Sequence, residues 1–388
     1  MYPYNYSRKL ETLNCAARDE RHKIVFHSAL LSLVLFFTIP SCLSRADGII
    51  SENASGNQHF QPKKRPSMPI SVFIAEMPPP NRLVVAYSPS YSQSSGMLVG
   101  SNSVSPQNVA ANTRWFYNPQ KFIRLTPEYT NTFLQNAKIH YGVNEDFSIA
   151  LTVSYVHNFL AFQTFKGPEG ITPLGKSYSE TMGLADLTST AVVRLYEDPI
   201  HKITLNIGAG YPVGSNTVNK NSLQSNGEYK TTRATYAQQP SSQTFSLLPG
   251  LLYSGYTGPL SWGLAYRGRV FLIDNNQGWR PGNSNEYDSW LGYNISPEVE
   301  PTIRATYTTW QPVTGFDVEI NGKTPGADPQ HYGGRRVDVH GGVIVNGKLL
   351  GLDNYVFASE VGAPVLQILN GPQQKTNWQG ALQIRYSY

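Results

Sequence analysis

The chain has 388 residues, a formal net charge of +5 at neutral pH, and only 15% charged side chains. Its 24 Tyr, 33 Gly and 27 Pro residues favour strands and turns over helices. The densest basic run is Lys63-Lys64-Arg65, in a stretch flanked by prolines. The charge pattern therefore gives no indication of a nucleic-acid-binding protein, and no nucleic-acid partner is predicted.

The first 46 residues (1–46) predict an N-terminal extension and a secretory signal peptide. Basic residues at 21–23 precede an apolar run that is strongest over 29–40, shorter than the roughly 20 residues that span a bilayer. Ser44-Arg45-Ala46 places small residues at the two positions that a signal peptidase reads. A short buried helix and a lipoprotein signal ending at Cys42 are the alternatives.

Both cysteines, Cys15 and Cys42, precede the predicted cleavage point. The mature chain would contain none, which excludes a disulfide framework and a cysteine metal or redox site. Residues 47–80 are polar and punctuated by prolines, and we expect an exported tail or linker there. The remaining residues, 81–388, form the main domain.

Strand-like runs with alternating apolar and polar side chains fill this main domain. Residues 187–195 and 203–211, for example, each place apolar groups on one face and small polar or cationic groups on the other. Twelve such runs are predicted, at 82–88, 131–142, 146–157, 184–197, 201–213, 244–257, 260–272, 285–295, 299–311, 335–346, 354–366 and 376–388.

The links between these runs alternate in length. Short links are expected at 143–145, 198–200, 258–259, 296–298 and 347–353. Long polar links are expected at 89–130, 158–183, 214–243, 273–284, 312–334 and 367–375. Short turns at one end, long loops at the other and an even strand number are typical of a transmembrane barrel. Since backbone groups in hydrocarbon must be paired, the sheet must close.

We therefore predict an all-β fold, a transmembrane antiparallel β-barrel of about 12 strands with short periplasmic turns and long outer loops. The last strand supports this prediction, because Leu382, Ile384, Tyr386 and Tyr388 alternate to an aromatic C-terminal residue. The predicted location is the bacterial outer membrane, and the predicted partners are the lipid bilayer and its outer-membrane lipids. The strand ending at Tyr388 is expected to contact the barrel assembly machinery.

The apolar face of each strand is expected to contact lipid and the polar face to line the lumen. A charge facing lipid at the midplane costs about 2–4 kcal/mol, and the apolar register turns the cations inward. Two functions remain open for them, a basic constriction that favours anionic solutes and an internal salt-bridge network that fills the barrel. The predicted lumen or solute-path residues are Arg267, Arg269, Arg304 and Arg336, with Asp338 as counter-charge, together with His340, Arg194 and Arg385.

Aromatic residues have two possible roles. Girdles at the membrane interfaces are expected from Tyr141, Tyr155, Tyr211, Tyr253, Trp310 and Trp378. A path for aromatic solutes is the alternative role for Trp279, Tyr287, Trp290 and Trp310.

An outer-membrane hydrolase is a further alternative. A lipid-cleaving site would need paired Ser and His on the outward face, where the register places His157, Ser289 and Ser359. These three lie on distant strands, and no orienting carboxylate for His157 is evident in the sequence. The chain is therefore predicted not to be an enzyme.

Several short motifs in a fixed order resemble a known family. They are Gly183-Leu-Ala-Asp-Leu187, Arg194-Leu-Tyr-Glu-Asp198, Leu205-Asn-Ile-Gly208 and Tyr211-Pro-Val-Gly214. Further matching stretches lie at 68–80, 247–263, 327–339 and 369–378. Together they resemble the outer-membrane transporter family named after the meta-pathway of phenol degradation, over residues 68–388.

The resemblance implies an outer-membrane barrel that moves hydrophobic or aromatic compounds, and it brings no catalytic residues with it. Ala185 stands where that family has a second glycine. Related sequences also cluster Met and His near the first strand, where this chain reads Val85-Ala-Tyr-Ser-Pro-Ser-Tyr91. Because soft-metal ligands are missing there, no metal site and no cofactor are predicted.

The predicted function is passive passage of small hydrophobic or aromatic solutes across the outer membrane. A plugged barrel that serves as a structural or interaction platform is the alternative, and a hydrolase comes after it.

Overall fold

The computed structural model describes residues 68–70 and 77–388. The predicted signal peptide, both cysteines and most of the tail at 47–80 lie outside the described residues, so those predictions stay predictions.

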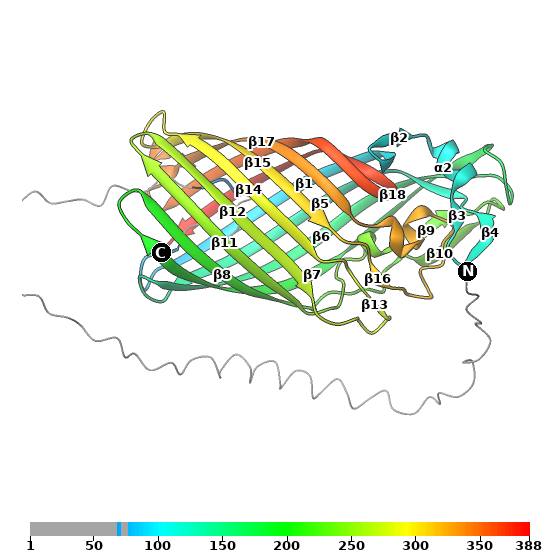
Figure 1. The fold of residues 1–388 in the computed structure, drawn as a ribbon, viewed down its shortest axis with the longest axis horizontal. Coiled ribbons are helices and arrows are strands. Elements are labelled where there is room, and N and C mark those ends of the chain that lie inside the picture. Colours follow the sequence, from blue (N-terminus) through cyan, green and yellow to red (C-terminus); the bar gives the residue numbers. More distant parts are fainter. Residues whose placement is uncertain (1–67, 71–76) are drawn as a thin grey trace, which may run out of the picture. The chain divides into compact units, whose positions relative to one another are not determined.

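A single large antiparallel sheet dominates the described residues, and its strands run side by side at a slant (Figure 1). β1 and β18 lie at opposite ends of the strand order and also pair with each other, so the sheet closes. The all-β barrel predicted from the sequence is confirmed. The wall strands are β1 (Leu83–Gly100), β5 (Leu125–Gly142), β6 (Phe147–Phe165), β7 (Pro173–Glu197), β8 (His201–Tyr211), β11 (Ser246–Thr257), β12 (Leu260–Phe271), β14 (Ser284–Tyr293), β15 (Val299–Trp310), β17 (Gly334–Asn346) and β18 (Tyr355–Ser387).

β18 supplies two passes through the wall. Its first part pairs with β17, from Val356 to Leu369, and its second part pairs with β1, from Leu369 to Ser387. The chain reverses near Gly371, whose φ of 58° is a left-handed value that favours glycine. The ring of eleven labelled strands therefore crosses the membrane twelve times, as the sequence predicts.

The links sort by length between the two ends of the barrel. Short turns connect the strands at the end where Tyr388 pairs with Leu83, and η4 (Gly347–Leu350) lies in one of them. The long links at the opposite end gather in Figure 1 around β3, β9 and β16. They carry β2 (Asn102–Val104), α2 (Pro106–Asn112), β3 (Arg114–Trp115), β4 (Asn118–Phe122), β9 (Asn219–Leu223), β10 (Tyr229–Arg233), η1 (Tyr236–Gln238), β13 (Trp279–Arg280), β16 (Thr314–Gly315), η2 (Pro325–Ala327) and η3 (Pro329–His331).

Three of the predicted long links are wrong. β1 continues to Gly100, so 89–100 is strand and not loop. β6 and β7 extend to Phe165 and back to Pro173, which leaves only 166–172 between them, and the link at 367–375 is a tight reversal inside β18. Strand pairing continues into residues 89–100 and 158–165, where the side chains do not alternate strictly between apolar and polar. The sequence pattern is lost there although the backbone ladder is not.

Exposure along the strands confirms the predicted register. Leu264 and Ile303, predicted to contact lipid, are 58% and 55% exposed, whereas Arg304 and Asp338 are 4% and 1% exposed. Apolar side chains thus coat the outside of the barrel and charged ones fill its inside. No helix among residues 68–70 and 77–388 is long and apolar enough to cross a membrane.

Candidate functional site

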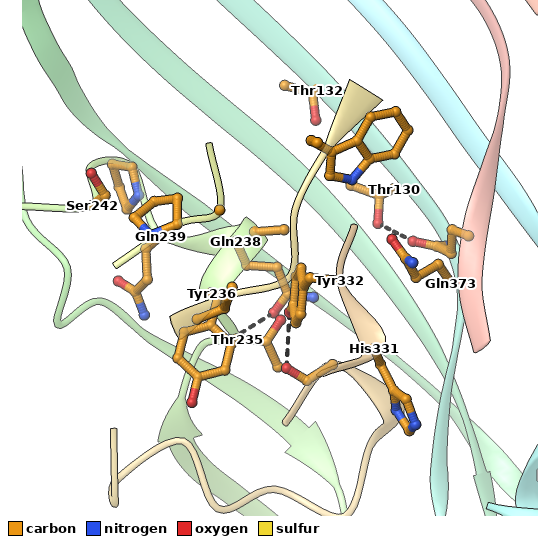
Figure 2. Close-up of a pocket in the computed structure, with 18 of the residues that line it drawn as sticks. Thr130, Thr132, Thr235, Tyr236, Gln238, Gln239, Ser242, His331, Tyr332 and Gln373 are labelled. Carbon is orange, nitrogen blue, oxygen red and sulfur yellow. Dashed lines mark hydrogen bonds between the residues drawn. The ribbon is translucent and has the colours of Figure 1, made fainter. Parts of the chain in front are cut away.

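A cavity of about 680 Å³, which we call the vestibule, lies at the end of the barrel that carries the long links. Figure 2 shows Tyr236, Gln238 and Tyr332 from these links beside Thr130 and Thr132 from the wall. Much of its lining is apolar or aromatic, and these residues are Met97, Leu134, Ala185, Tyr236, Pro240, Phe271, Trp279, Trp310, Val313 and Tyr332.

The roof of the vestibule is a buried apolar cluster built from three different long links. Tyr236 meets the ring of Trp279 edge to face at 4.9 Å and that of Tyr332 at 5.6 Å. Val313 and Ile320 complete the packing, with Ala327 buried beside them. Burial raises the pKa of Tyr332 to about 12, so its hydroxyl stays protonated and donates to the Gly326 carbonyl at 2.8 Å. The roof is therefore packed like a small core.

Asp317 ties the long links together. The carboxylate of Asp317 lies 3.0 Å from Arg233 Nη1. The backbone N–H of Asp317 donates to the Tyr236 hydroxyl, and the backbone carbonyl of Asp317 accepts a hydrogen bond from the Tyr117 hydroxyl. Burial, with the charge of Asp317, raises the pKa of Tyr117 to about 12. Since these partners come from the links at 101–124, 212–245 and 311–333, one residue holds the three in a common arrangement.

Arg269 lies at the base of the vestibule and is paired there. Its guanidinium binds the carboxylate of Asp186 from β7, and its Nε donates to the Ser246 hydroxyl at 3.3 Å. The other oxygen of Asp186 accepts a hydrogen bond from the Ser241 hydroxyl at 2.6 Å. The positive charge that was predicted to meet solute is thus largely neutralised.

A second cavity of about 300 Å³, the central pocket, lies in the charged part of the lumen. Its lining brings together five of the eight predicted lumen residues, Arg267, Arg304, Arg336, Asp338 and His340. Each of the three arginines binds a carboxylate. Their partners are Glu286 for Arg267, Asp288 and Glu360 for Arg304, and Asp338 for Arg336.

The other predicted residues lie elsewhere. Arg194 is beside the short β5–β6 turn, where its Nε donates to Asp146 at 2.8 Å and its Nη1 to Glu197 at 2.7 Å. Arg385 in β18 lies opposite Ala86 of the neighbouring strand β1, near the same end of the barrel. Neither is among the described residues that line the vestibule or the central pocket.

The segment before β1 contacts the inward face of the wall. Met68 packs against Leu252 and Trp290, and Met77 packs against Ala150 and Val192. Gly142 permits the approach of the segment, since a Cβ at that position would lie 2.2 Å from the Pro79 carbonyl oxygen. Met68 and Met77 therefore occupy part of the lumen, Met77 toward the end with the short turns.

One stretch of the wall borders both the central pocket and a groove on the outer face. A groove of about 760 Å³ crosses β1, β17 and β18, and its lining includes the lipid-facing Trp378, Val361 and Leu382. The inward-facing Glu360 lines both this groove and the central pocket, as do Ser90, Tyr91, Gly380 and Ala381. Three of these shared residues, Ser90, Gly380 and Ala381, have small side chains.

The aromatic side chains divide differently from the prediction. Trp279 and Trp310 line the vestibule, and Trp290 is 4% exposed inside the lumen. Tyr287 is 48% exposed on the outer face, so it does not belong to an inner path. The girdle role predicted for Trp310 is wrong, because Trp310 shares the inward parity of Arg304 and not the outward parity of Tyr307.

The prediction for His157 also needs one correction. Its Nε2 lies 2.9 Å from Glu180 Oε2 on the neighbouring strand, and its ring packs on Phe159 at 4.0 Å. A carboxylate does orient this histidine, and the register of β6 and β7 is what places it. Ser289 and Ser359 lie on β14 and β18, which several strands separate from β6 in the sheet order. Among the described residues, no group of three His, Cys, Asp or Glu is placed to hold a metal ion.

Comparison with known proteins supports the fold. No model of a known protein family matches the sequence, and no curated protein matches it significantly. The COG4313 outer membrane channel from Pseudomonas putida F1 is similar in structure, with a TM-score of 0.52 and 11% identity over 81% of this chain and 98% of that one. The chain therefore has the fold of an outer-membrane β-barrel.

More distant barrels also match. The monoaromatic hydrocarbon channel CymD gives a TM-score of 0.36 and 8% identity over 80% of this chain and 88% of that one. A FadL homologue from Pseudomonas aeruginosa gives 0.37 and 10% over 79% and 89%.

Proposed function

We propose that this protein is a passive channel of the bacterial outer membrane for small hydrophobic or aromatic solutes. The vestibule carries this proposal. Its volume of about 680 Å³ falls within the roughly 300–1,000 Å³ of small-molecule sites, which are mostly apolar with a few placed polar groups. Trp279, Trp310 and Phe271 provide such an apolar lining.

The similar solved structure supports a transport role, because it is described as an outer membrane channel. The motifs at 183–187 and 211–214 support kinship with the transporter family of the meta-pathway of phenol degradation. We therefore propose that kinship as well, and a non-enzymatic role with it.

The cavities suggest a route. The vestibule and the central pocket share Thr132 and Leu134, and the central pocket shares Glu360 and Ala381 with the wall groove. Met68 and Met77 occupy other parts of the lumen. An apolar solute gains little from water or from ion pairs, so the stretch of wall shared by the central pocket and the groove is its way out toward lipid.

The charged side chains of the central pocket are then best assigned a structural role. Arg267, Arg304 and Arg336 each bind a carboxylate, which leaves little net positive potential for an anionic solute. Of the two roles that the sequence left open, these pairs favour the salt-bridge network. We propose that the network fills and braces the barrel.

The C-terminal strand is proposed as the segment that the barrel assembly machinery recognises. Tyr388 donates its backbone N–H to the Leu83 carbonyl at 2.8 Å, and Leu382 is 59% exposed on the outer face. The end of the chain thus lies at the seam where the barrel closes.

A platform without transport is the second candidate, and the contact of Met68 with the lumen wall favours it. Uptake in cells separates the two. A strain that lacks the gene should take up radiolabelled ethylbenzene more slowly than the complemented strain, with glucose uptake unchanged. Equal ethylbenzene uptake with folded protein at the cell surface would contradict the channel and favour the platform.

A further inference from the structure

The wall groove, the cavity of about 760 Å³ on the outer face, crosses the seam where the barrel closes. Its lining comes from β17, from both passes of β18 and from β1, and it reaches Phe133 in β5. Neighbouring strands lie about 4.8 Å apart, so these five adjacent passes extend over roughly 19 Å. One leaflet is about half of a hydrocarbon core of roughly 30 Å. The groove is therefore long enough for a chain that reaches through a leaflet.

Two glycines leave the floor of the wall groove without side chains. Gly341 of β17 lies between Ile303 and Val361 in the cross-strand pairing, and these two side chains are 55% and 58% exposed on the outer face. A Cβ at Gly341 would meet no described atom within 4 Å. At Gly380, a Cβ would lie 3.6 Å from the Trp378 ring and 4.0 Å from the Val361 side chain. The floor thus has a notch at Gly341 that larger outer-face side chains border.

Aromatic side chains border the wall groove, and two of their polar groups are bound along the wall. The rings of Tyr91 and Trp378 lie 5.2 Å apart. Trp378 Nε1 donates to Gln93 at 3.0 Å, and the Tyr87 hydroxyl donates to Gln135 at 2.8 Å. Because these indole and phenol groups have partners on the wall itself, their rings offer the groove apolar surface.

The position of the wall groove indicates its occupant. Leu382, which lines it, is 59% exposed on the outer face, the face that carries the lipid-facing Leu264 and Ile303. Burial of polar groups without partners is costly, which disfavours a peptide or a polar solute against this lining. An elongated apolar molecule that reaches the outer face of an outer-membrane barrel is an acyl chain of the bilayer.

We propose that the wall groove is a lipid-binding site that holds one acyl chain of a membrane phospholipid. The chain lies over Gly341 and Gly380 and packs against the rings of Tyr91 and Trp378. It covers the stretch of wall that also borders the central pocket. The site does not depend on transport, so it would be present in a channel and in a platform alike.

Filling the notch at Gly341 tests the proposal. Native mass spectrometry of the full mature chain in detergent, titrated with palmitoyl-oleoyl phosphatidylglycerol, measures the affinity for the first lipid. Gly341→Leu should weaken this affinity about five- to tenfold, because the new side chain takes the place of buried methylene groups. Ala305→Leu is the matched control. Ala305 is exposed on the outer face of β15 and is not part of the lining, so the change should be less than twofold.

Two results of this titration would overturn the proposal. One is equal affinity of the wild-type protein and Gly341→Leu. The other is an equal loss in Gly341→Leu and Ala305→Leu, which would show that any added bulk on the outer face has the same effect. A dimer that is present in the wild-type spectra and absent in Gly341→Leu would identify a second copy of this chain as the occupant and would also overturn it.

Trp378→Ala gives a second reading if Gly341→Leu disturbs the barrel. It removes one side of the groove and should weaken lipid binding about fivefold. Trp262→Ala is its matched control, since Trp262 also lies on the outer face, with its Nε1 bound to the Tyr253 hydroxyl at 3.1 Å, and is not part of the lining. Equal affinities of these two variants would overturn the site.

The headgroup provides the last arm of the experiment. Phosphatidylethanolamine with the same two acyl chains should bind within about twofold of phosphatidylglycerol, because the groove contacts the chain. Binding of only one of the two headgroups would show that the headgroup is recognised instead and would overturn the assignment of an acyl chain.

Discussion

The guanidinium of Arg304 binds both carboxylate oxygens of Glu360, with Nε 3.2 Å from Oε2 and Nη2 2.5 Å from Oε1. Arg304 is in β15 and Glu360 is in β18, so the pair spans β17 on the inside of the barrel. Both side chains are only 4% exposed, and Asp288 binds the same guanidinium at 2.5 Å. A buried fork of this kind is geometrically specific.

Loss of one member of this pair should destabilise the barrel. Arg304→Ala leaves Glu360 and Asp288 buried without a counter-charge, and breaking a buried ion pair in this way costs about 3–5 kcal/mol. We expect the free energy of unfolding in detergent, measured by guanidinium titration, to fall by that amount.

Neutralising the whole group should restore most of the loss. Arg304→Met combined with Glu360→Gln and Asp288→Asn removes every unpaired charge, and buried ion pairs often exchange for neutral groups at little cost. Wild-type stability in Arg304→Ala alone would show that this network contributes nothing to the barrel.

A side chain at Gly263 should destabilise the barrel, because the ring of Trp290 occupies the space beside it. A Cβ at this position would lie 2.1 Å from the ring of Trp290, which is buried in the lumen beside Met68. Gly263→Ala should reduce the free energy of unfolding by about 1–3 kcal/mol through overpacking.

Gly341→Ala is the matched control, since a Cβ there meets no atom within 4 Å. It should leave stability within about 0.5 kcal/mol, the range of surface substitutions. Equal effects of the two changes in the same guanidinium titration would remove the packing explanation.

The buried Lys220 predicts that the stability of the long link that contains it depends on pH. It is 4% exposed in β9, its ammonium group lies 4.0 Å from the centre of the Phe162 ring and 3.0 Å from Gln238 Oε1, and burial lowers its pKa to about 7. An unfolded lysine titrates near about 10.4, so between these values the unfolded link binds more protons. Stability of the link is then greatest above about pH 10.4 and falls as the pH drops, with the loss complete below about pH 7.

Hydrogen exchange of residues 219–241 between pH 7 and pH 10 measures this effect after correction for the intrinsic exchange rate. Protection should increase with pH in the wild-type protein. In Lys220→Met the slope should disappear, whereas Lys230→Met, which removes an exposed lysine of β10, should retain it. A wild-type protection that falls with pH would contradict the assignment.

The alternation of side chains was enough to predict the barrel and its inward residues. Arg304 and Leu264 occupy opposite parities of their strands. Because one face of the sheet contacts lipid and the other a filled lumen, the parity of a residue decides which of the two its side chain faces. For the same reason Trp310, which has the parity of Arg304 in β15, fits the inner-path role that the sequence also offered and not the girdle role.

The vestibule could not be predicted in the same way. Trp279 and Tyr236 belong to long links without a period, and their contact depends on three links folding over one another. The partner of His157 follows from the register of β6 against β7, which bulges near Val153. Pairing between strands is a tertiary property, so a single sequence left Glu180 unconnected to the histidine.

Blocking the vestibule tests the channel most directly. Ala185 lines the vestibule, whereas the adjacent Leu184 is 47% exposed on the outer face. Initial uptake of radiolabelled ethylbenzene should fall to the level of the deletion strain in cells that carry Ala185→Trp, and Leu184→Trp should retain the wild-type rate at equal surface abundance. Wild-type uptake by the Ala185→Trp cells would contradict passage through this cavity.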